Sequence, residues 1–216
     1  MRLPVPTPAL LAAGVAATPL FVAVAVAQAV TRDGFELGPH MASQLSAGEH
    51  GWMQIANFLV TGVLFLAAAA GFRRALPDAP GRIWAPRLIA AFGGTFIASG
   101  LFVADPAAGY PVGAAEGTTW HGVLHGVSAA LSGVVVTAAL LVLARHFSAR
   151  GSRPRAITSI VAAVVFLIVP WTVPGQTGLL LLAAAAFSWG WLSFLAADLL
   201  RTPAPAEPQT PRLAHA

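Results

Sequence analysis

The chain has 216 residues, of which 57% are hydrophobic and only 9% are charged, and its mean hydropathy is +0.75. Soluble domains carry about 25% charged residues, so this composition excludes an ordinary soluble domain and indicates an integral membrane protein. The net charge of +4 comes from arginines without lysine, and because these arginines lie between apolar runs, the charge indicates membrane topology rather than a nucleic-acid-binding surface.

Six uncharged apolar runs follow one another along the chain, and each is close to the roughly 20 residues that cross ~30 Å of hydrocarbon. Small residues are frequent in the runs, which allows helix backbones to pack closely in a bilayer. We therefore expect an all-α fold, a multi-pass transmembrane helical bundle with six spans, in one domain over residues 1–200. The expected spans cover about residues 9–30, 55–72, 88–104, 122–144, 156–173 and 178–197.

The two ends of the chain have separate predictions. The run 9–30 follows Arg2 and contains Ala27-Gln28-Ala29, features that cleaved signal peptides also show. Its length exceeds the roughly 7 to 15 residues of a signal peptide's apolar region, so a retained span is expected, with cleavage as the alternative. The proline-rich segment 201–216 is expected to be a disordered cytoplasmic tail.

Arginine placement predicts the orientation of the bundle. The segments between spans two and three, between spans four and five, and at both termini contain every arginine except Arg32. The positive-inside rule places these segments on the cytoplasmic side. We therefore expect a protein of the bacterial inner (cytoplasmic) membrane with both termini in the cytoplasm, in which His121 opens the fourth span from the outer face.

Two outer segments are expected to cover that outer face. Residues 31–54 are too polar to span, and Met41, Leu45 and Gly48 predict a short interfacial helix that ends at Gly48. Residues 105–120 contain two prolines and three glycines, so we expect a turn-rich lid there. Asp105 would lie directly under this lid.

Four short motifs are spread over the chain: Gly38-Pro39-His40 with Ser43, Gly51-Trp52 with Gln54, Asn57 and Phe58, Phe102 with Asp105-Pro106 and Tyr110-Pro111, and Trp120-His121 with His125. As a set, they resemble the bacterial six-helix membrane family called domain of unknown function 998, over roughly residues 10–200. The resemblance implies a multi-pass inner-membrane protein without an assigned reaction.

The outer face gathers the residues that are best suited to chemistry. His121 and His125 are four residues apart, so on a helix both side chains point the same way, and His40 and Asp105 map to the same face. Cysteine is absent, and three imidazoles around zinc with a water in the fourth position form a known catalytic arrangement. We therefore predict a zinc site made of His40, His121 and His125, with Asp105 and Ser43 as catalytic groups of a metal-dependent hydrolase that acts on a lipid or amphipathic substrate.

This set is also similar to the His, Ser, Asp and H-x-x-x-H pattern of the alkaline ceramidase and adiponectin-receptor superfamily of membrane hydrolases. Those proteins have seven spans with the paired histidines in the last one, whereas here the pair opens the fourth of six expected spans. The likeness is therefore one of site chemistry and not of fold.

A non-catalytic membrane accessory or lipid-binding module is the alternative, in which His121 and His125 hydrogen-bond loop carbonyls and hold the lid. A haem fits less well, because two histidines on one helix face cannot bind iron from opposite sides. A transporter fits less well, because no run has a central charge. Membrane lipids are the expected partners and nucleic acid is not, while the sequence does not indicate an oligomeric state.

Three further polar residues are expected to have structural roles. Gln54 and Asn57 lie three residues apart in the second span, a spacing that favours hydrogen bonds to a neighbouring helix. Asp198 lies three residues before Arg201, where a local ion pair is expected.

Overall fold

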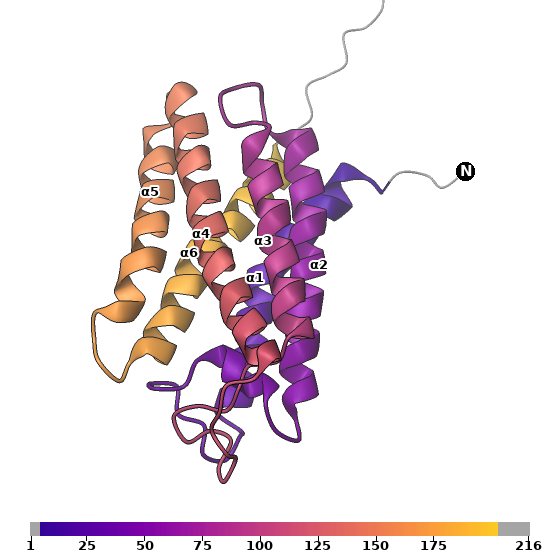
Figure 1. The fold of residues 1–216 in the computed structure, drawn as a ribbon. Coiled ribbons are helices and arrows are strands. Elements are labelled where there is room, and N and C mark those ends of the chain that lie inside the picture. The colour runs from indigo at the N-terminus through magenta and orange to yellow at the C-terminus, as the bar shows by residue number, and fades with distance from the viewer. Residues whose placement is uncertain (1–4, 203–216) are drawn as a thin grey trace, which may run out of the picture.

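The computed structural model describes residues 5–202, which form six α-helices and two short 3-10 helices without a β-strand (Figure 1). This arrangement confirms the predicted all-α fold. The helices are α1 (Thr7–Ala29), η1 (Ala42–Ser46), α2 (Gly51–Ala75), α3 (Trp84–Leu101), α4 (Trp120–Ala149), α5 (Arg153–Ile168), η2 (Val169–Trp171) and α6 (Thr177–Arg201). Apart from Arg201 and Thr202, the predicted tail at 201–216 lies outside the described residues.

Five of the six long helices in residues 5–202 are long and apolar enough to cross a membrane, namely α1, α2, α4, α5 with η2, and α6. The sixth, α3, has 18 residues, which corresponds to about 27 Å of helix at 1.5 Å per residue. Its first turn contains Trp84, Pro86 and Arg87, which lower its hydropathy. The chain is therefore a multi-helix membrane protein with five clear candidate spans.

Several helix ends differ from the limits of the apolar runs. α3 begins and ends earlier than the expected span at 88–104, and residues 102–104 are not helical. Pro86 is tolerated in a first turn, and Pro106 disfavours the helical conformation of the residue before it. Likewise α5 ends at Ile168, before Pro170, so the expected span at 156–173 is divided into an α-helix and a 3-10 turn.

The six helices form a closed ring. Each packs against its neighbours in sequence, and α6 returns to pack against α1. Aromatic side chains from three helices fill the interior, where Phe21, Phe96 and Trp189 have ring centroids 5.1 to 5.4 Å apart in edge-to-face contacts. Such contacts stabilise the interior beyond their area burial.

Neighbouring helices are joined by close backbone approach and by buried amides. Gly62 of α2 faces Gly93 of α3, and a Cβ on either residue would lie within 2.7 to 2.8 Å of the carbonyl oxygen of the other. Between α1 and α2, the Gln28 amide donates to Gln54 Oε1 at 2.8 Å, and the Asn57 amide donates to the Phe21 carbonyl at 3.1 Å. The predicted interhelical role of Gln54 and Asn57 is confirmed.

The two ends of the bundle differ in charge. The end where α2, α4 and α6 finish, which we call the arginine end, is uppermost in Figure 1. Within the described residues it contains nine arginines, whereas Arg32 alone lies at the opposite end, which we call the loop end because the two long loops lie there. The arginines at the arginine end are Arg73, Arg74, Arg82, Arg87, Arg145, Arg150, Arg153, Arg155 and Arg201.

Candidate functional site

The loop end is covered by two segments that pack against each other, residues 30–50 and 102–119. The first contains η1, so the predicted short helix is confirmed as a 3-10 turn, and Gly48 beyond it has a positive φ of 78°. The second is the predicted turn-rich lid. The Gln44 amide donates to the Ala107 carbonyl at 2.6 Å, which ties the lid to η1.

His40 belongs to this junction between the two segments. The backbone N–H of Glu36 donates to His40 Nδ1 at 2.9 Å, so Nδ1 is the unprotonated nitrogen. Nε2 then carries the proton and donates to the Ala108 carbonyl at 3.0 Å. The ring is 5% exposed and packs against Phe35 and Tyr110. Both nitrogens of His40 are therefore engaged within the loops.

His121 and His125 connect the start of α4 to the end of α3. His125 Nδ1 lies 2.7 Å from the Phe102 carbonyl and 3.1 Å from that of Ser99, and His121 Nδ1 lies 3.0 Å from the Val103 carbonyl. Because carbonyls only accept, both Nδ1 atoms carry a proton. The last carbonyls of a helix lack partners within it, so His125 caps α3 through Ser99 and the C-cap residue Phe102, whereas His121 holds the first loop residue, Val103.

Asp105 caps the start of α4 from the other side. Its carboxylate accepts the Thr119 backbone N–H at 2.9 Å and the Thr119 hydroxyl at 2.5 Å, and Thr119 Oγ1 in turn accepts the N–H of Gly122. These two hydrogen bonds from Thr119 lower the pKa of Asp105, and they outweigh the desolvation that raises it. Asp105 is therefore held as a carboxylate at a helix N-terminus.

Gly122 makes this arrangement possible. A Cβ at this position would lie 1.9 Å from Asp105 Oδ2, so no other residue leaves room for the carboxylate against the first turn of α4. Hydrogen bonds of His121, His125 and Asp105 thus join the lid, the end of α3 and the start of α4.

The structure brings together only part of the predicted zinc and catalytic set. Asp105 Oδ1 lies 4.0 Å from His121 Nδ1, and His125 lies one turn further along α4. Within residues 5–202, however, no three His, Asp or Glu side chains are grouped so that they could hold one metal ion. Ser43 is half-buried in η1, where its carbonyl accepts the Ser46 hydroxyl. Two histidines provide fewer than the three protein ligands of a catalytic zinc site.

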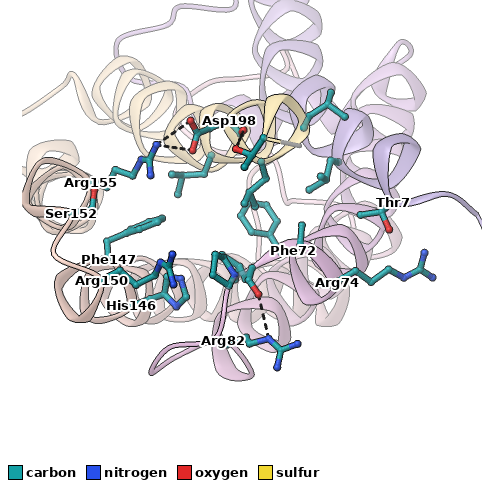
Figure 2. Close-up of a pocket in the computed structure, with 18 of the residues that line it drawn as sticks. Thr7, Phe72, Arg74, Arg82, His146, Phe147, Arg150, Ser152, Arg155 and Asp198 are labelled. Atoms are coloured by element: carbon teal, nitrogen blue, oxygen red, sulfur yellow. Dashed lines mark hydrogen bonds and ion pairs between the residues drawn. The ribbon is translucent and has the colours of Figure 1, made fainter. Parts of the chain in front are cut away.

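A cavity of about 920 Å³ opens at the arginine end, between the ends of α1, α2, α4, α5 and α6 (Figure 2). Buried apolar side chains, among them Leu11, Phe72 and Leu195, form part of its wall. The charged residues that line it are four arginines and two aspartates: Arg74, Arg82, Arg150, Arg155, Asp78 and Asp198. The cavity is therefore amphipathic and basic.

Both aspartates of this cavity already face an arginine. Asp198 pairs with Arg155 of α5 at 2.9 Å, so the expected local pair with Arg201 is wrong, because the packing of α5 against α6 supplies a nearer cation. Asp78 lies 3.8 Å from Arg82. Arg150 has no ion-pair partner in the part of the chain that the structure describes. The cavity thus keeps an excess of positive charge.

His146 also lines this cavity, and the sequence analysis overlooked it. Its side chain is fully buried, and its Nδ1 lies 3.2 Å from the Pro80 carbonyl, whereas Nε2 has no hydrogen-bond partner among the described residues. His146 lies in the last turn of α4 and Arg150 is the C-cap residue four positions later, the same spacing as His121 and His125. That repeated spacing at the basic end of the helix is the signal that could have identified it.

A comparison with known proteins places the chain in a family. The family model described as "Protein of unknown function (DUF998)" matches residues 15–198. No curated protein and no solved structure matches the chain. The matched range includes α2, α4 and α5 with η2 entirely, and the larger part of α1 and of α6. This multi-pass helical membrane protein therefore belongs to the DUF998 family.

Proposed function

We propose that this protein is a lipid-binding membrane module whose cavity at the arginine end binds the phosphate of an anionic lipid headgroup. The observation that carries this proposal is a cavity of about 920 Å³ with four arginines in its lining, against two aspartates that are each paired. Guanidinium groups bind phosphate through charge-assisted and often bidentate hydrogen bonds. Basic pockets between membrane helices on the cytoplasmic side are known to bind lipid headgroups.

The apolar part of the cavity favours a lipid over a soluble phosphate compound. Pro8, Pro77 and Leu200 line the cavity and are exposed, so apolar surface as well as charge faces it. A lipid would place its phosphate among the arginines and its glycerol and first methylenes against these side chains. A free phosphate ion would leave that apolar surface without a partner.

The proposal includes a topology of six spans with both termini on the cytoplasmic side. α3 packs between α2 and α4 and runs antiparallel to both, from the arginine end to the loop end (Figure 1). Its Arg87 lies in the first turn, where an arginine reaches the interface. The positive-inside rule then assigns the arginine end to the cytoplasm, so the cavity opens towards the inner leaflet.

In this account the loop end has a structural role, as in the lipid-binding alternative drawn from the sequence. The hydrogen bonds of His121 and His125 to the end of α3 support it, as do those of Asp105 to the start of α4. A zinc hydrolase would need a third ligand, and both nitrogens of His40 are engaged in hydrogen bonds to Glu36 and Ala108.

Titration of the detergent-purified protein with phosphatidylglycerol, followed by native mass spectrometry, tests this function. We expect saturable binding of about one lipid, weaker binding of phosphatidylcholine, and about fivefold weaker phosphatidylglycerol binding by Arg150→Gln, since one cation near a phosphate contributes about 1 kcal/mol. Arg145→Gln is the matched control, because Arg145 is an exposed arginine of the same helix that does not line the cavity.

Two results separate the outcomes. Displacement of the lipid by millimolar inorganic phosphate would assign the site to a soluble phosphate compound. Equal binding of phosphatidylglycerol by the Arg150 and Arg145 variants would show that the lipid does not bind in the cavity, since only Arg150 lines it.

A further inference from the structure

His146, which lines the cavity at the arginine end, has one buried ring nitrogen without a hydrogen-bond partner among the described residues. The Pro80 carbonyl, 3.2 Å from His146 Nδ1, can only accept, so Nδ1 carries the proton of the neutral ring. Nε2 therefore presents a lone pair, and no donor in the part of the chain that the structure describes reaches it. A buried acceptor without a donor costs free energy, and a ligand that supplies a donor recovers it.

The charge of the cavity limits which donor can approach. Four arginines line it, and its two aspartates are engaged with Arg155 and Arg82. An ammonium group, such as that of phosphatidylethanolamine, is repelled by this excess of positive charge. A hydroxyl group donates without a charge. The same cavity therefore favours a phosphate for its arginines and a hydroxyl for His146.

Resting on the proposed phosphate-binding function, we propose that the ligand is a lipid whose phosphodiester headgroup carries free hydroxyl groups, of the phosphoglycerol or similar polyol type. One hydroxyl donates to His146 Nε2 while the phosphate contacts Arg150. Arg150 is the C-cap residue of α4 and its backbone N–H bonds to the His146 carbonyl, so the two residues are neighbours, and Figure 2 shows both at the cavity.

A hydroxyl reaches His146 Nε2 only after a side chain of the cavity wall moves, because this atom is buried. The nitrogen has essentially no solvent-accessible surface, whereas the Arg150 side chain, one turn further along the helix, is exposed. A long, exposed arginine changes rotamer readily. A movement of the cavity wall that brings a hydroxyl to Nε2 can accompany the binding of the phosphate by the arginines.

Native mass spectrometry with two lipids of equal charge tests this specificity. Phosphatidylglycerol and phosphatidylmethanol are both monoanionic phosphodiesters, and only the first carries headgroup hydroxyls. We expect the wild type to bind phosphatidylglycerol about tenfold more tightly, the difference expected for one buried hydrogen bond. His146→Asn is expected to bind both lipids equally, because its amide can still donate to the Pro80 carbonyl but places nothing at the position of Nε2.

The outcomes distinguish this inference from the function on which it rests. If the wild type binds the two lipids with equal affinity, and more tightly than phosphatidylcholine, the hydroxyl specificity is wrong and phosphate binding stands. Binding of neither anionic lipid above phosphatidylcholine overturns both. If His146→Asn keeps a tenfold preference for phosphatidylglycerol over phosphatidylmethanol, a residue other than His146 binds the headgroup hydroxyl. The comparison of lipids needs only the wild type, so it remains decisive even where the variant does not fold.

Discussion

At the loop end, two histidines and an aspartate meet the backbone: His121 and His125 donate to carbonyls at the end of α3, and Asp105 accepts from Thr119 at the start of α4. At the arginine end, His146 donates one hydrogen bond to the Pro80 carbonyl and leaves Nε2 without a partner among the described residues. Histidines of one helix, α4, thus support the fold at one end of the bundle and line a basic cavity at the other.

This difference indicates that a polar residue near a membrane interface is best classified by whether its buried hydrogen-bonding atoms have partners within the protein. The histidine pair of the loop end is the more conspicuous feature of the sequence, yet its Nδ1 atoms already donate to backbone carbonyls at the end of α3 and at the start of the lid. Of the six buried side-chain atoms without a hydrogen-bond partner among the described residues, His146 Nε2 belongs to the residue that lines the arginine-rich cavity at the other end. Ligand binding is therefore expected where the protein has not already satisfied its own groups.

Gly122→Ala is expected to have the largest effect on the loop end. Its Cβ would lie 1.9 Å from Asp105 Oδ2, so the carboxylate must leave the first turn of α4, at a cost of about 3 kcal/mol in unfolding free energy. Thermal or denaturant unfolding in detergent measures this loss. Gly126→Ala, one turn further along α4, is the matched control, since nothing lies within 4 Å of a Cβ there and its stability should not fall.

His125→Phe is expected to destabilise the protein by about 2 kcal/mol, because the Phe102 and Ser99 carbonyls lose their donor in a buried position. His125→Asn should recover most of that stability, since its amide nitrogen can occupy the place of Nδ1. Equilibrium unfolding of the two variants compares them directly.

A double variant of the two histidines tests the zinc hypothesis for the loop end. Under the capping account, element analysis of the purified protein should give the same result for the wild type and for the variant with both His121 and His125 changed to Asn. Stoichiometric zinc in the wild type that disappears in this folded variant would make the loop end the functional site.

Asp105→Asn is expected to have a smaller, pH-dependent effect. The pKa of Asp105 in the folded protein lies below the ordinary value of 3.8, because Thr119 donates two hydrogen bonds to its carboxylate. The carboxylate therefore stabilises the fold fully above about pH 5, and this contribution is lost as the pH falls below 3.8 and through the lowered folded pKa. The difference in melting temperature between the wild type and the variant should shrink in that range. A difference that grows as the pH falls would contradict the capping role.

The bundle and its loop end were largely predictable from the sequence, because they depend on local signals. Apolar runs of nearly membrane length predict the helices, and the spacing of His121 and His125 predicts their common face. The helix ends were less predictable, since α4 continues through Arg145 to Ala149 and α3 starts before Arg87. A helix tolerates charged residues at its ends, so the limits of an apolar run are not the limits of the helix.

The arginine-end cavity was not predictable, because contacts between distant residues create it. Asp198 meets Arg155, 43 residues earlier in the chain, and His146 meets Pro80, 66 residues earlier. Neither distance in sequence corresponds to a local rule such as the spacing of residues on one helix face. The metal hypothesis had the same weakness: it assumed that His40 would turn to the histidine pair, whereas His40 bonds to Glu36 and Ala108.

The central claim is that the ligand site lies at the arginine end, and mapping a photoreactive lipid tests it most directly. Phosphatidylglycerol with a photoreactive headgroup can be crosslinked to the protein in nanodiscs, and the labelled peptides can be identified by mass spectrometry. The account predicts saturable labelling within residues 72–82, 146–155 and 195–202, which line the cavity, and loss of this labelling in Arg150→Gln but not in Arg145→Gln. Saturable labelling at residues 102–125 instead would place the site among His121, His125 and Asp105 and contradict the account.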